Sequence, residues 1–149
     1  MMTITTKRLG AGDRELARRT FRLMVEVFEE GDAALSDGYV DRLLRDERFW
    51  AFAALRGDEV VGGITAHTLP LTRTESSEVF IYDIAVAVEH QRAGVGRALV
   101  AALRTAAARA GMGDLFVPAD NDDTHALDFY RRLGGAASAV TFFTFPGPS

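Results

Sequence analysis

The sequence predicts one α/β (α+β) domain, residues 1–149, in which helices flank a mixed sheet. Runs rich in β-branched and aromatic residues alternate with segments whose apolar residues recur at helical spacing, which is typical of this class. Gly57-Asp58 separates two such runs and indicates an antiparallel hairpin. A long helical segment separates two others and indicates a parallel pair.

Composition excludes several classes of protein. An apolar content of 48% and a charged content of 26% are ordinary for a globular chain, and a net charge of −4 argues against a nucleic-acid partner. The chain has no apolar run long enough for a membrane span and no signal-peptide core, so we expect a cytoplasmic protein. Cysteine is absent, and the three histidines form no HxxxH or HExxH pair, so no metal site is predicted.

The first part of the chain reads as a strand followed by two helices. Thr3–Leu9 is a short strand, after which Asp13 can cap an amphipathic helix that ends near Glu29. Ser36 caps a second helix that runs to about Arg45. The residues expected to face inward on these helices are Leu16, Thr20, Leu23, Met24, Val27, Phe28, Tyr39, Val40, Leu43 and Leu44.

Three strands follow, at residues 49–55, 60–69 and 78–86. His67 lies in the second of them, where a lone histidine is more often a structural residue than a ligand. A loop then opens a helix that runs to about Ala110. Its expected apolar stripe consists of Val95, Leu99, Ala102, Leu103, Ala106 and Ala110.

The last part of the chain predicts a strand, a helix and a final strand. The strand at residues 115–117 would run parallel to the strand at residues 78–86, and Pro118 either lets these two strands part or simply ends the pairing. A helix then runs to Gly134-Gly135, and Val140–Phe145 is the last expected strand.

The loop between residues 91 and 97 is the most informative motif. Helix-start amides lack internal partners and carry partial positive charge, so a strand, a glycine loop and a helix together suggest a phosphate cradle. Gly94 and Gly96 leave the amides open, and Arg92 and Arg97 add charge. A helix cap without a ligand is the alternative. The spacing fits neither a P-loop nor a Rossmann fingerprint.

The loop resembles the Q/R-x-x-G-x-G/A signature of the GNAT acyl-CoA N-acetyltransferases, and Ala126–Gly134 resembles that family's A-x-x-[FL]-Y-x-x-x-G helix. The order of elements is also similar, and it implies a mostly antiparallel sheet, a parallel pair at the acetyl-CoA site and about four helices. Within the family, the chain resembles the type I aminoglycoside 3-N-acetyltransferases at Phe80–Val86, Glu89-His90, Ala119-Asp120 and Asp122-Asp123. That likeness implies acetylation of a 3-amino group, antibiotic resistance and a homodimer.

The resemblance assigns the cofactor site. In this family the loop amides hold the pyrophosphate of acetyl-CoA, and the strand before the loop pairs with its pantetheine arm. The implied cofactor-binding residues are Ile84, Ala85, Val86, Gln91, Arg92, Ala93, Gly94, Val95, Gly96 and Arg97. Since the chain has no cysteine, direct transfer in a ternary complex is favoured over an acyl-cysteine intermediate.

Asp83 and Tyr130 are the candidate catalytic residues. Asp83 is a carboxylate in an otherwise apolar strand, where an unpaired charge is costly, so it should reach a cleft, a partner or water. It could accept the amine proton, hold the substrate ammonium, or only bind backbone amides. Tyr130 reads as a core tyrosine by spacing, but the family likeness implies that it protonates the leaving thiolate.

A polycationic aminoglycoside requires an acidic cleft. The candidate substrate-binding residues are Glu29, Glu30, Asp32, Asp120, Asp122 and Asp123. A solvated loop is the alternative for the first three, and a helix N-terminal cluster for the others. Two functions compete with this one. The enzyme could acetylate a polyamine or a protein amine, or the chain could be a regulatory module that binds acetyl-CoA.

Overall fold

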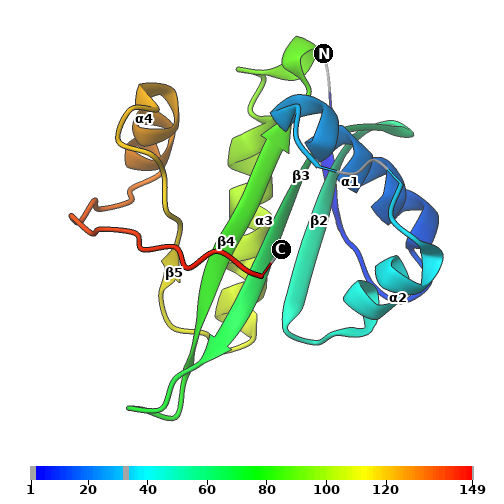
Figure 1. Cartoon of the computed structure of the whole chain (residues 1–149). Helices are drawn as coiled ribbons and strands as arrows, with labels where there is room; N and C mark the ends of the chain where they lie inside the picture. The colour runs from blue at the N-terminus through cyan, green and yellow to red at the C-terminus, as the bar shows by residue number, and fades with distance from the viewer. Residues whose placement is uncertain (1–2, 32–33, 149) are drawn as a thin grey trace. The chain divides into compact units, whose positions relative to one another are not determined.

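The computed structural model describes residues 3–31 and 34–148, and within them it forms a five-stranded sheet and four α-helices (Figure 1). The elements are β1 (Thr5–Arg8), α1 (Arg14–Phe28), α2 (Asp37–Arg45), β2 (Phe49–Arg56), β3 (Glu59–Pro70), β4 (Ser77–Val86), the 3₁₀ turn η1 (Val88–His90), α3 (Val95–Arg109), β5 (Leu115–Phe116) and α4 (Thr124–Arg132).

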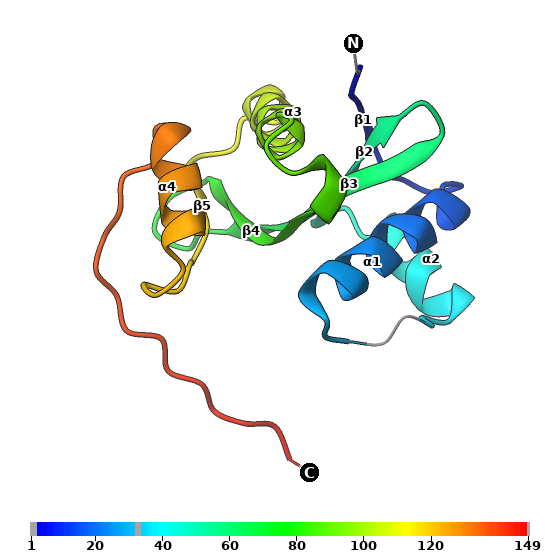
Figure 2. The ribbon, with the colours of Figure 1, turned by 90° about the horizontal axis from the view of Figure 1, so that it is seen from above.

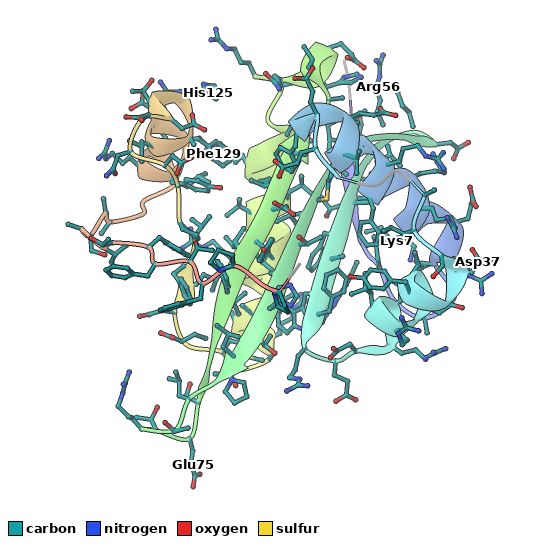
Figure 3. All side chains as sticks on the ribbon, viewed as in Figure 1. Lys7, Asp37, Arg56, Glu75, His125 and Phe129 are labelled. Atoms are coloured by element: carbon teal, nitrogen blue, oxygen red, sulfur yellow. The ribbon has the colours of Figure 1, made fainter. Side chains whose placement is uncertain are left out.

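The strands follow the order β1-β2-β3-β4-β5. The first three pairs are antiparallel, and β5 runs parallel to β4, with Leu115 beside Val79 and Phe116 beside Phe80. Arg56 marks the end of β2, and Glu75 marks the tip of the β3–β4 connection (Figure 3). The mixed, mostly antiparallel sheet with one parallel pair is therefore confirmed.

The chain forms two compact units, Met1–Pro118 and Ala119–Ser149. The first unit contains the sheet with α1, α2 and α3, and the second contains α4 and the C-terminal segment. The expected single domain stays a prediction.

In the first unit, α1 and α2 cover one face of the sheet and α3 covers the other (Figure 2). The face under α1 and α2 will be called the α1 face. Ser36 caps α2 as predicted, because its hydroxyl accepts the amide of Tyr39 at 3.1 Å. The Arg14 guanidinium donates to both carboxylate oxygens of Asp41, at 2.9 and 2.5 Å, and so ties α1 to α2. The buried cluster on this face consists of Leu9, Ala17, Phe21, Met24, Val40, Ala51, Ala53 and Ala85.

Two adjacent glycines let helices approach both faces of β3. A Cβ built on Gly62 would lie 2.8 Å from the Val95 side chain on α3. A Cβ built on Gly63 would lie 2.5 Å from Thr20 on α1. Successive residues of a strand point to opposite faces, so each glycine makes room for a different helix.

Some side chains differ from the sequence prediction. Asp13 precedes α1 but does not cap it, because its carboxylate accepts the Gly10 amide at 2.8 Å instead. Phe28 and Tyr39 are exposed. The buried stripe of α3 includes Val100 and Ala107, which had not been predicted, while Ala102 and Ala106 are only half-buried and Ala110 is exposed.

The predicted strand at Val140–Phe145 is wrong, because no strand forms in the described part of the second unit. A strand needs a neighbouring edge for its backbone hydrogen bonds, and the described ladders give this segment none. Its large apolar side chains are exposed. They are Val140, Phe142, Phe143 and Phe145.

Candidate active site

The loop between η1 and α3 has the backbone of a helix-start cradle. Gly94 is the N-cap of α3 and has φ +84°, a left-handed conformation that favours glycine. Arg92 also has a positive φ, 66°, and its side chain is exposed. The amide group of Gln91 donates to the Val86 carbonyl at 3.3 Å, which ties the loop to the end of β4.

The start of α3 presents amides without a side-chain cap among the described residues. The first amides are those of Val95, Gly96 and Arg97. A Cβ at Gly94 would meet no heavy atom within 4 Å, so space is open beside this turn. The Val95 side chain is buried against β3, so only its backbone is available to a ligand, whereas Ala93 and Arg97 are exposed.

The second half of β4 has one unpaired edge. Ile84, Ala85 and Val86 pair with Ile64, Gly63 and Gly62 of β3. On the other side, β5 pairs only with Val79 and Phe80, and within the described residues no strand continues beside Ile84–Val86. The pairing ends at Phe116, two residues before Pro118, which agrees with both predicted readings of that proline. Backbone groups along this edge are available to an extended ligand.

A β-bulge in β4 decides where Asp83 points. Ala66 pairs with Ile81 and Thr65 pairs with Asp83, so Tyr82 is the extra residue. Cross-strand partners share a face, and Gly63, which points to the same face as Thr65, approaches α1. Asp83 therefore lies on the α1 face of the sheet, where it is half-buried.

Burial raises the pKa of the Asp83 carboxyl above its ordinary value, and the negative charge of Glu30 raises it further, while His67 lowers it. A raised pKa makes Asp83 a stronger base. The described part of the chain gives its carboxylate no hydrogen bond, which leaves a role in binding backbone amides without support.

Sequence reasoning missed two neighbours of Asp83. Tyr82 is 62% exposed, and its ring meets the His67 ring at 5.7 Å between centroids. His67, which the sequence favours as a structural residue, has its ring centroid 5.5 Å from that of Phe49 and acts electrostatically on Asp83. In the sequence, only the polar Tyr-Asp pair within an apolar strand could have indicated these neighbours. The bulge itself depends on pairing with β3, so no local pattern predicts it.

The predicted acids fall into both units. Glu29 ends α1 in a left-handed conformation, and Glu30 follows it; both are exposed. The negative charge of Glu30 raises the pKa of Asp83, so Glu30 lies within electrostatic range of that carboxyl. Asp32 lies outside the described residues.

The second unit contains Tyr130 and the other acids. Asp123 caps α4, because its Oδ1 accepts the Ala126 amide at 3.0 Å, so the helix-cap alternative holds for this residue. Asp122 is exposed, and the Asp120 carbonyl accepts the Asp123 amide. Burial, and then the charge of Asp123, raises the pKa of the half-buried Tyr130 hydroxyl, which keeps it protonated near neutral pH. His125 and Phe129 also project from α4 (Figure 3).

Two other features use none of these residues. Glu59, Glu89 and His90 place one ligand atom each within 4.8 Å of one another, so the predicted lack of a metal site stays a prediction. A recess between β1 and α3 shares no residue with the groups above.

Among the described residues, no helix is long and apolar enough to cross a bilayer.

The resemblance to the GNAT acetyltransferases assigns acyl-CoA binding to two features, an open strand edge and a helix start with unpaired amides, and the first unit contains both. The sequence profile of the acetyltransferase (GNAT) family matches residues 14–135. The chain therefore belongs to the GNAT acetyltransferase family.

Several solved structures of acetyltransferases are similar to this chain. Two aminoglycoside acetyltransferases from uncultured soil metagenomic samples, meta-AAC0020 and HMB0005, are each 32% identical to this chain, with TM-scores of 0.92. The alignment with meta-AAC0020 covers 97% of both chains, and that with HMB0005 covers 99% of this chain and 100% of the other. The aminoglycoside N-acetyltransferase AAC(6')-Iy in complex with CoA is 15% identical, with a TM-score of 0.82 over 98% of this chain and 96% of the other, which shows the fold alone. No curated protein sequence matches the chain.

Proposed function

We propose that this acetyltransferase uses acetyl-CoA to acetylate an amine of an aminoglycoside by direct transfer in a ternary complex. The observation that carries the proposal is the meeting of three features in one unit: the unpaired edge of β4, the amides at the start of α3, and the carboxylate of Asp83. The 32% identity to two aminoglycoside acetyltransferases supports the choice of acceptor, and one of them has been solved with sisomicin.

The cofactor would be held by backbone and charge. The amides of Val95, Gly96 and Arg97 would bind the pyrophosphate, with Arg92 and Arg97 adding positive charge. The pantetheine arm would pair with the free edge at Ile84–Val86, where a backbone amide can polarise the acetyl carbonyl.

The reaction then needs two proton movements. The acceptor nitrogen forms a bond to the acetyl carbon as the carbon–sulfur bond breaks. Asp83 takes the proton that leaves the nitrogen, directly or through water, or it holds the substrate ammonium. Tyr130, which is protonated near neutral pH, donates a proton to the departing thiolate. The joint action of Asp83 and Tyr130 stays a prediction, since each belongs to a different unit.

Several finer assignments belong to the same proposal. Acetylation of the 3-amino group and antibiotic resistance follow from the resemblance to the type I enzymes, and a cytoplasmic location follows from the use of acetyl-CoA. A homodimer would cover the exposed side chains of Val140, Phe142, Phe143 and Phe145, since large exposed apolar patches often mark interfaces.

One assay tests the proposed function against its alternatives. CoA release from acetyl-CoA is measured with sisomicin and gentamicin, with spermidine and with lysine-containing peptides, and product spectra identify the acetylated nitrogen. Release with the aminoglycosides alone is the expected result. Release with spermidine or peptides alone would replace the acceptor, and acetyl-CoA binding without release on any acceptor would indicate a regulatory module.

A further inference from the structure

Five aromatic rings form a strip on the α1 face of the sheet. This aromatic strip consists of Phe49 on β2, His67 on β3, Phe80 and Tyr82 on β4, and Phe116 on β5. Neighbouring ring centroids lie between 5.0 and 5.7 Å apart, so each ring is held by at least one other.

The bulge in β4 joins the aromatic strip to the carboxylate of Asp83. In a regular strand Tyr82 and Asp83 would point to opposite faces. In β4 the bulge changes this alternation. Ile81 pairs with Ala66 and points to the face that α3 covers, whereas Asp83 pairs with Thr65 on the α1 face. Tyr82 lies between them and contacts His67, which is also on the α1 face. Two residues that are adjacent in sequence therefore present an aromatic ring and an acid side by side on one face.

The middle and one end of the aromatic strip are open to solvent. Tyr82 is 62% exposed and Phe116 is 42% exposed, although both rings contact neighbours in the strip. Contacts with His67 and Phe80 limit how the Tyr82 ring can rotate. The Tyr82 side chain would therefore lose little conformational entropy when a ligand binds to it. The face of a fixed aromatic ring attracts both sugar C–H groups and cations.

We propose that Tyr82 is a specificity-determining residue that binds one ammonium-bearing ring of the acceptor, with Asp83 beside it as the counter-charge. The proposal rests on the function proposed above and assigns part of the acceptor site to this face. The charges on the face favour a cationic occupant, because Asp83 and Glu30 are both acids and Glu30 acts on Asp83 electrostatically. A neutral apolar partner would leave the Asp83 carboxylate buried without a counter-charge, which is unfavourable.

Direct binding of sisomicin, measured calorimetrically on the full chain saturated with CoA, tests the proposal. Tyr82→Leu removes the ring and should weaken sisomicin binding by about 3- to 30-fold, the range expected for losing a cation–π contact. Tyr82→Phe keeps the ring and should bind within about twofold of wild type. Tyr39→Leu removes an exposed tyrosine on α2 and is the matched control, which should leave sisomicin binding unchanged. In all three variants CoA affinity and melting temperature report whether the fold is intact.

Each outcome has a defined meaning. Equal affinity in Tyr82→Leu and wild type would overturn the proposal, and so would a wild type that does not bind sisomicin. An equal loss in Tyr82→Phe and Tyr82→Leu would assign the effect to the hydroxyl and also overturn the aromatic contact. Binding of sisomicin without CoA release from acetyl-CoA would sink the proposed function while leaving the role of Tyr82 in place.

Discussion

At the scale of single residues, the environment of Asp83 bears on its proposed role. Its carboxyl is half-buried on the α1 face, lies in the field of Glu30 and His67, and accepts no hydrogen bond from the described residues. These conditions suit a base or an ammonium anchor, and kinetics can separate the two roles.

Asp83→Asn keeps the shape of the side chain and removes its charge. If Asp83 is the base, kcat should fall by about 10²–10⁴-fold, the usual effect of losing general acid–base catalysis. The loss should shrink as pH rises, because more of the acceptor amine is then already unprotonated. A pH–rate profile beside wild type is the measurement, with Tyr130→Phe as the comparison variant. Tyr130→Phe lacks the hydroxyl proton that would be donated to the thiolate. Its kcat should fall less than that of Asp83→Asn, and the decrease should not shrink at high pH.

A pH-independent loss in Asp83→Asn, together with a raised acceptor KM, would contradict the role of base and make Asp83 the anchor.

The raised pKa of Asp83 also predicts how stability depends on pH. The folded state holds this proton more tightly than the unfolded state, whose pKa is about 3.9. The contribution of the group to stability is therefore fully present below that value and is lost as pH rises through the folded pKa. Asparagine does not ionise, so Asp83→Asn should melt higher than wild type near neutral pH. The two proteins should converge below about pH 4. Thermal unfolding over this range is the measurement, and a lower melting temperature for Asp83→Asn at pH 7 would refute the argument.

At the scale of elements, β3 is packed by helices on both faces through adjacent glycines. Gly62→Ala would bring a methyl group to 2.8 Å from Val95, and Gly63→Ala would bring one to 2.5 Å from Thr20. Each substitution should cost about 1–3 kcal/mol of unfolding free energy through overpacking. Gly10→Ala is the control, since its Cβ would meet no heavy atom within 4 Å. Denaturant unfolding measures all three, and wild-type stability for Gly63→Ala would show that α1 can shift without cost.

The two ends of α3 provide a matched test of the cofactor cradle. Gly94 and Gly111 both have left-handed backbones, with φ of 84° and 71°, and a Cβ on either would meet no neighbour. Valine should strain both sites similarly. Only Gly94→Val should weaken acetyl-CoA binding, by about 10- to 100-fold, as expected for losing one hydrogen bond to a charged group. Calorimetric titration is the measurement. Arg92→Ala and Arg97→Ala should weaken acetyl-CoA binding less. Equal acetyl-CoA affinities in Gly94→Val and Gly111→Val would contradict the proposal that the start of α3 binds the pyrophosphate.

At the scale of the whole molecule, the C-terminal segment exposes several large apolar side chains. Phe142, Phe143 and Phe145 are 71%, 79% and 91% exposed. If this segment forms the interface of the proposed homodimer, replacing all three phenylalanines with serine should convert a dimer to a monomer in light scattering. Val88→Ser changes an equally exposed apolar residue on η1 and should leave the dimer intact. A monomeric wild type would exclude the dimer.

The sequence by itself determined the order of the elements from β1 to α4, because that order depends on local signals. Hydrophobic patterns predicted the four helices and the five sheet strands that the described residues form, and Ser36 marked the start of α2 at the position observed. The motif at Gln91–Gly96 predicted a cofactor loop, because a phosphate cradle is made by consecutive backbone groups. That role stays a prediction.

Only the tertiary structure decided which residues face one another. The bulge that turns Tyr82 and Asp83 to the same face arises from the register between β3 and β4, which no local pattern records. The pairing of Gly62 with α3 and of Gly63 with α1 likewise depends on packing. Val140–Phe145 failed as a predicted strand for the same reason: its sequence favours a strand, but a strand exists only where another edge accepts its hydrogen bonds.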